Sequence, residues 1–141
     1  MDRKGSAVWK GSIREGAGSV STESGTLAAA PYSFTSRFEH GAGTNPEELL
    51  GAAHAGCFSM AFSGQLGAAK LTPESIETTA TVTVEKVDGG FAITRVHLAC
   101  KVSVPGADRA QVEAAAANAK AGCPVSKLFK ADITLELALV V

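Results

Sequence analysis

The stretch Asn45-Pro-Glu-Glu-Leu-Leu-Gly-Ala-Ala-His-Ala-Gly-Cys-Phe-Ser-Met60 decides the fold of this chain. It opens as a helix: Asn45 is a good N-cap, Pro46 fits the first helical position, and Glu47 places negative charge at the positive end of the helix dipole. Nearly every side chain from residue 49 to 69 is small or apolar. A helix that is apolar on all sides is buried, so we expect a long, buried central helix.

The bulk composition places the chain among ordinary globular proteins. With 141 residues, 45% of them hydrophobic and 19% charged, we expect one domain over residues 1–141. A net charge of -1 favours neither nucleic acid nor an acidic membrane surface as a partner. The Gly and Ala content of the central helix argues against a membrane span. The N-terminal residues lack the apolar core of a signal peptide, which predicts a cytoplasmic protein.

The cysteines also limit the class of protein. Three are present, without a CxxC pair or a Cys/His comb, so neither a structural zinc site nor a secreted disulfide scaffold is expected. Reduced cytosolic thiols fit better, with any disulfide being a working one.

Alternating and helical patterns on either side of the central helix predict an α+β fold in which helices cover one face of an antiparallel β-sheet. Three gaps between strands, at residues 15–18, 24–25 and 88–90, are marked by turn residues, and a second, Ala-rich helix is expected to end at Gly122. The predicted strands are residues 6–14, 19–23, 27–37, 75–87, 91–104 and 133–141, and the further helical segments are residues 108–121 and 123–130.

The apolar helix surface exceeds what a sheet of this size covers. The N-terminal strands are also thin as an independent layer. An obligate homodimer would bury the excess, and we therefore expect one.

Two of the three cysteines have a setting that suits chemistry. Cys100 lies on the apolar face of a predicted strand and is interpreted as a core residue. Cys123 stands between a helix-ending glycine and Pro124, where backbone N–H groups favour a thiolate. Cys57 lies in mid-helix, where burial disfavours the thiolate; it is either a small core residue or a nucleophile met by a cation.

The candidate cations are His54 and Arg37. His54 lies three residues before Cys57 and is either its partner or a hydrogen-bonded packing residue. Arg37 precedes the helix and is either that cation or a solvated strand end. Glu47 is ten residues from Cys57, about 15 Å along one helix. If both serve one site, either two helices pack antiparallel in a dimer or a long arginine bridges the gap.

The run Thr44–Met60, together with Cys123-Pro124 after an Ala-rich helix and Trp9 in the first strand, resembles the OsmC/Ohr family of thiol-dependent hydroperoxide reductases. The likeness covers nearly the whole chain, and the Gly-Ala-Ala-His-Ala form before the cysteine resembles the OsmC branch.

The resemblance implies an intertwined homodimer with two interfacial sites. Cys57 matches the family's peroxidatic cysteine, Cys123 its resolving cysteine, Arg37 its arginine and Glu47 its glutamate. It implies that Arg37, oriented by Glu47, holds Cys57 as a thiolate, which a peroxide oxidises to a sulfenic acid. Cys123 then closes a disulfide, and an external dithiol or lipoyl protein reduces it. No metal or other cofactor is implied.

An apolar lining is expected from Leu49, Phe58 and Phe129, and it favours organic hydroperoxides over hydrogen peroxide. Two alternatives remain. One is an acyl-transfer enzyme built on Cys57 and His54, and the other is a non-catalytic dimeric protein whose apolar cleft binds a small ligand.

Overall fold

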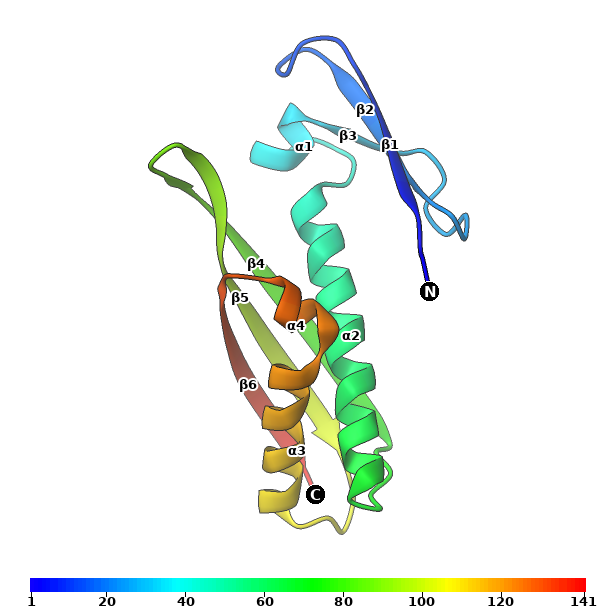
Figure 1. The fold of residues 1–141 in the computed structure, drawn as a ribbon, viewed down its shortest axis with the longest axis vertical. Coiled ribbons are helices and arrows are strands. Elements are labelled where there is room, and N and C mark those ends of the chain that lie inside the picture. The colour runs from blue at the N-terminus through cyan, green and yellow to red at the C-terminus, as the bar shows by residue number, and fades with distance from the viewer. The chain divides into compact units, whose positions relative to one another are not determined.

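A computed structural model describes all residues, 1–141, and divides into two compact units, Met1–Leu49 and Leu50–Val141 (Figure 1). No helix combines the length and the hydropathy that a membrane span requires. The elements follow in the order β1 Gly5–Lys10, β2 Ala17–Thr22, β3 Ala30–Ser33, α1 Phe34–Phe38, α2 Pro46–Ala68, β4 Ser75–Val87, β5 Gly90–Ser103, α3 Arg109–Gly122, α4 Pro124–Leu128 and β6 Asp132–Val140.

The first unit contains an antiparallel sheet in the order β1-β2-β3. Gly18 of β2 stands opposite Trp9 on one side and Tyr32 on the other. A Cβ at Gly18 would come within 2.5 Å of the Tyr32 ring and 2.8 Å of the Trp9 ring, so only glycine fits. The two rings meet over it with centroids 5.3 Å apart. The contact between the two rings links β1 and β3 across Gly18, which has no side chain of its own to stabilise the central strand.

The segment predicted as extended over residues 27–37 is only partly a strand. β3 ends at Ser33, and Arg37 lies on the short helix α1 rather than at a strand end. The reason is a reciprocal cap: the Ser36 N–H donates to Ser33 Oγ at 3.2 Å, and the Ser33 N–H donates to Ser36 Oγ at 2.8 Å. Such a pair satisfies two backbone donors at once and starts a helix.

The second unit contains the sheet β4-β5-β6. The hairpin predicted between β4 and β5 is confirmed, with the turn at Asp88 and Gly89. The expectation of an antiparallel sheet is wrong for the last strand, because β6 pairs with β5 in parallel. α3 and α4 lie between these strands in the chain, and such a crossover brings the chain back to run in the same direction.

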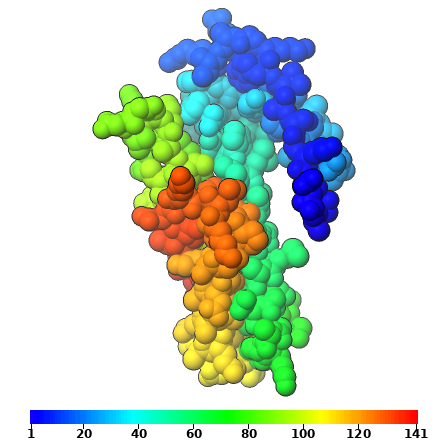
Figure 2. Space-filling model, viewed as in Figure 1, coloured from blue at the N-terminus to red at the C-terminus, as the bar shows by residue number.

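Helix α2 begins as predicted, since the Glu48 N–H donates to Asn45 Oδ1 at 2.8 Å. From Leu50 onward, α2 and α3 lie side by side on one face of the sheet (Figure 1), and their side chains meet in the space-filling view, in green and yellow-orange (Figure 2). The residues shared by this core are Phe58, Phe62, Leu66, Leu98, Cys100, Val102, Val104, Val112, Ala115, Ala116 and Ala119.

Burial of α2 on all sides is not observed within the single chain. One stripe is buried, at Gly51, His54, Phe58, Phe62 and Leu66, with the three- and four-residue spacing of a helix face. The other side is exposed, most clearly at Met60, which is 80% exposed. One small sheet and one neighbouring helix cover only one side of a helix, so the remaining apolar surface is left open.

Candidate active site

Cys57 and Cys123 are joined by a disulfide, with their Cα atoms 6.0 Å apart. Cys57 lies in the middle of α2 and is only partly buried, although the sequence predicted full burial. Cys123 is 0% exposed. The pair therefore combines one partly buried cysteine with a second that is enclosed by the protein.

Cys123 is held by the backbone at the junction of two helices. Its N–H donates to the Ala119 carbonyl at 2.9 Å and closes α3, and its own carbonyl accepts the Lys127 N–H at 3.1 Å inside α4. α3 runs through Gly122, which was predicted to lie just beyond its end, and Cys123 itself is the C-cap. The sequence suggested that the Cys123 sulfur would accept backbone N–H groups at the start of α4. It makes no such capping hydrogen bond, and its partner is Cys57.

Arg37 and Glu47 form a forked ion pair within the first unit. Arg37 Nη2 donates to Glu47 Oε1 at 2.7 Å, and Arg37 Nε donates to both carboxylate oxygens at 3.1 and 3.3 Å. The Glu47 side chain is 15% exposed, so little water competes for its oxygens. The guanidinium also lies 5.1 Å from the centre of the Phe38 ring. Two-point contact to a carboxylate and packing on a ring restrict the orientation of the guanidinium.

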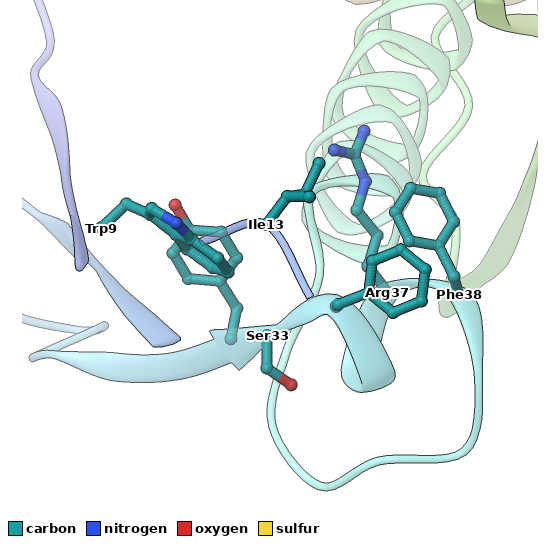
Figure 3. Close-up of a pocket in the computed structure, with 7 residues that line it drawn as sticks. Trp9, Ile13, Ser33, Arg37 and Phe38 are labelled. Atoms are coloured by element: carbon teal, nitrogen blue, oxygen red, sulfur yellow. The ribbon is translucent and has the colours of Figure 1, made fainter. Parts of the chain in front are cut away.

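A cavity of about 290 Å³ opens beside this ion pair (Figure 3). Its walls are aromatic or aliphatic except for Ser33 and the guanidinium of Arg37. The lining residues are Trp9, Ile13, Tyr32, Ser33, Phe34, Arg37 and Phe38. An apolar chamber with a single cation on its wall suits a molecule with an organic body and one polar end.

None of the three residues expected to supply an apolar lining, Leu49, Phe58 and Phe129, lines this cavity. Phe58 is 0% exposed and packs against Phe62 in the core, and Phe129 packs against the His54 ring. Arg37 is the only lining residue that was predicted as a site residue, and Trp9 was named only for the resemblance. The others were not predicted because they come from a short strand, a turn and a five-residue helix. Only the number of aromatic residues before residue 40 was a signal for them.

His54 is fully buried and does not pair with Cys57. Its Nε2 lies 2.8 Å from Ser126 Oγ of α4, and the Phe129 ring packs against it with centroids 5.3 Å apart. Its Nδ1 has no hydrogen-bond partner. Burial lowers the pKa of His54 below its ordinary value of 6.5, because the charged imidazolium loses its hydration. This environment fits a neutral packing residue and removes the basis for a Cys57–His54 nucleophile.

The third cysteine, Cys100, is 3% exposed on β5. Burial raises the pKa of its thiol, and a hydrogen bond from Thr78 Oγ1 at 3.5 Å opposes this only in part. An enclosed thiol in this state is a poor nucleophile, which agrees with its interpretation as a core residue. No cluster of three or more His, Cys, Asp or Glu side chains is arranged to hold a metal ion.

Residues 39–138 match the family described as OsmC-like protein. The chain is 57% identical over 139 residues to Peroxiredoxin OsmC of Escherichia coli (strain K12), covering 99% of this chain and 97% of that protein. It is 34% identical over 100 residues to an organic hydroperoxide resistance protein of Xanthomonas axonopodis pv. citri, covering 70% and 68%. The solved structure of an organic hydroperoxide resistance protein OsmC from Legionella pneumophila superposes with a TM-score of 0.67 at 26% identity, covering 98% and 97%.

The buried state of His54 predicts a pH dependence of stability. Because the folded-state pKa lies below 6.5, the unfolded chain takes up the proton first as the pH falls. The contribution of a neutral His54 is therefore complete above pH 6.5 and is lost progressively below it. Urea unfolding of reduced protein at a fixed concentration, from pH 8 to pH 5, should show a smaller loss of stability in His54→Gln than in wild type. Parallel curves for the two proteins would contradict this.

Proposed function

The chain belongs to the OsmC-like protein family, and we propose that it is a cysteine-based peroxidase that reduces organic hydroperoxides, and hydrogen peroxide more weakly, in defence against oxidative stress. The observation that carries this proposal is the link between the partly exposed Cys57 and the enclosed Cys123. A peroxide can approach the first sulfur, while the second is shielded from it. The cytoplasm, where dithiol reductants are available, is the proposed location.

The proposed cycle uses only thiol chemistry. The Cys57 thiolate attacks one oxygen of the O–O bond, the bond breaks, and the leaving alkoxide takes a proton to become an alcohol. The sulfur loses two electrons and becomes a sulfenic acid. The Cys123 thiol then displaces the hydroxyl as water and forms the disulfide. An external dithiol, either a small molecule or the lipoyl group of a protein, returns both cysteines to thiols, and no metal or organic cofactor takes part.

Arg37 is proposed to stabilise the Cys57 thiolate, with Glu47 as its positioning residue. A guanidinium that is already fixed by a forked carboxylate loses little freedom when it meets a third group. The cavity beside Arg37 is proposed to hold the organic body of the peroxide, since its walls are mostly aromatic. This assigns the preference for organic substrates to Trp9, Tyr32 and the α1 phenylalanines instead of Phe58 and Phe129.

A homodimer is proposed as the working form. The exposed side of α2 carries Met60 and small residues, and a second copy of the chain would cover it. Glu47 and Cys57 are separated by ten residues of one helix, about 15 Å. In a dimer the two copies can complete each other's sites, which supports this assembly over a monomer.

The cysteine cycle can be tested by counting thiols before and after one equivalent of cumene hydroperoxide. Wild-type protein, reduced beforehand, should lose two of its three thiols, with Cys100 left unreactive until the protein is unfolded. Neither Cys57→Ser nor Cys123→Ser should lose two. The same loss should be slower with hydrogen peroxide. An unchanged thiol count in wild type would refute the peroxidase proposal and favour the alternative of a non-catalytic ligand-binding protein.

The role of Arg37 can be tested with Arg37→Lys, which keeps the charge but cannot form the fork. We expect kcat/KM for cumene hydroperoxide to fall about tenfold or more, because charge-assisted hydrogen bonds are worth roughly 1.5–3 kcal/mol. Absorbance at 240 nm should show less Cys57 thiolate at neutral pH than in wild type. Arg109→Lys, at an exposed ion pair on α3, is the matched control and should behave as wild type. Unchanged activity in Arg37→Lys would exclude the proposed role.

The dimer can be tested by analytical ultracentrifugation at micromolar concentration. Met60→Glu places a charge in the centre of the exposed side of α2 and should increase the monomer fraction, because a buried unpaired charge is costly. Val87→Glu, at the tip of the β4–β5 hairpin, is the control. A wild-type protein that sediments as a monomer would show the proposal to be wrong.

A further inference from the structure

Helices α2 and α4 are connected by two links, of which only one is covalent. The disulfide joins Cys57 to Cys123, and a hydrogen bond of 2.8 Å joins His54 to Ser126. Each partner of the second link lies three residues from a cysteine, which is about one helical turn. The order is reversed, because His54 precedes its cysteine and Ser126 follows its own. The two helices therefore run in opposite directions here, and the two links lie next to each other, about one helical turn apart.

The hydrogen bond attaches the one buried side chain of α4 to α2. Ser126 is the only buried residue of this five-residue helix, and Leu128 is 73% exposed. No large apolar side chain of α4 is buried in the core. An apolar contact comes from Phe129, just after the helix, whose ring packs on His54, and Val125 within the helix is half-buried. The Ser126 hydroxyl is thus the polar contact that joins α4 to α2.

The His54 end of the link is rigid. The ring is 0% exposed and belongs to the same buried stripe of α2 as Phe58 and Phe62. Its Nδ1 is already without a partner, so loss of Ser126 would leave both ring nitrogens buried and unpaired. Burying an unpaired polar group is unfavourable, and this opposes any movement of α4 away from α2.

We propose that His54 and Ser126 are positioning residues for closure of the disulfide, which hold Cys123 beside Cys57 while no covalent bond joins them. The inference rests on the proposed cysteine cycle. In that cycle the Cys57 sulfenic acid has two fates. Cys123 can displace its hydroxyl as water to form the disulfide, or a second hydroperoxide can oxidise it to a sulfinic acid and leave as an alcohol. By keeping α4 in place, the His54–Ser126 bond favours the first fate over the second.

The test is Ser126→Ala, compared with Ser59→Ala as a matched control. Ser59 also lies on α2 near Cys57 and makes a 2.8 Å hydrogen bond, but to Thr78 of β4. Reduced proteins are mixed with excess cumene hydroperoxide, and stopped samples are analysed by mass spectrometry for sulfenic acid trapped with dimedone, disulfide and sulfinic acid. In Ser126→Ala we expect disulfide closure to slow about fivefold, the factor that corresponds to a typical hydrogen bond of about 1 kcal/mol, with the sulfinic fraction rising to match.

The first step should not change, because oxidation of the Cys57 thiolate does not involve α4. Ser59→Ala should close its disulfide at the wild-type rate, and Ser126→Thr, which keeps the hydroxyl, should regain much of the loss. If Ser126→Ala does not fold, His54→Gln, which keeps an amide donor, is compared with His54→Leu.

Three results would overturn the inference: wild-type closure in Ser126→Ala, equal slowing of both steps, or an equal effect of Ser59→Ala. Wild-type protein that forms no disulfide would instead refute the proposed function itself.

Discussion

The structure of the second unit depends on the packing of one stripe of α2 into the core. Phe58 and Phe62 have ring centroids 5.7 Å apart and are both 0% exposed, and Leu66 continues the stripe. Truncation of such side chains in other proteins costs about 3–5 kcal/mol. Because this stripe must stay buried, it fixes the rotation of α2 about its axis and its position along the sheet. At Gly51 a Cβ would lie only 3.0 Å from the Ala80 carbonyl oxygen of β4, which shows how closely the helix approaches the sheet. His54 and Cys57 take their positions from this docking.

The second constraint is the crossover from β5 to β6. The chain leaves β5 and passes along α3, and it must then turn back to place β6 parallel to β5. On this path one helix ends and the next begins at Cys123, before the chain turns toward β6. A cysteine at such a junction has a backbone fixed by two helices, and Ser126 is the one buried residue of the short helix that follows. The disulfide thus joins α2 to the junction of α3 and α4, and the His54–Ser126 hydrogen bond lies one helical turn away from it.

The first unit contains an aromatic cavity beside an ion pair. Its aromatic side chains gather around Arg37, and the carboxylate of Glu47 fixes the guanidinium from the other side. The Trp9–Tyr32 pair requires glycine at position 18, so the shape of the cavity is tied to the strand pairing of a small sheet. The Arg37–Glu47 ion pair and the aromatic cavity are therefore brought together by contacts within the first 49 residues, without the core of the second unit.

Local patterns in the sequence determined much of this protein. Asn45 and Pro46 predicted the start of α2, Asp88 and Gly89 the hairpin, and the alternation from Val96 to Val104 the buried face of β5, because each depends on neighbouring residues only. The resemblance of residues 44–60 and of Cys123-Pro124 to a known family indicated the four site residues, whose catalytic roles remain proposals. Only the tertiary structure decided the parallel pairing of β6, the open side of α2, the aromatic cavity at Arg37 and the bond between His54 and Ser126. These features join residues far apart in the chain, up to 72 positions for the last, and no local pattern encodes which distant partner a side chain will meet.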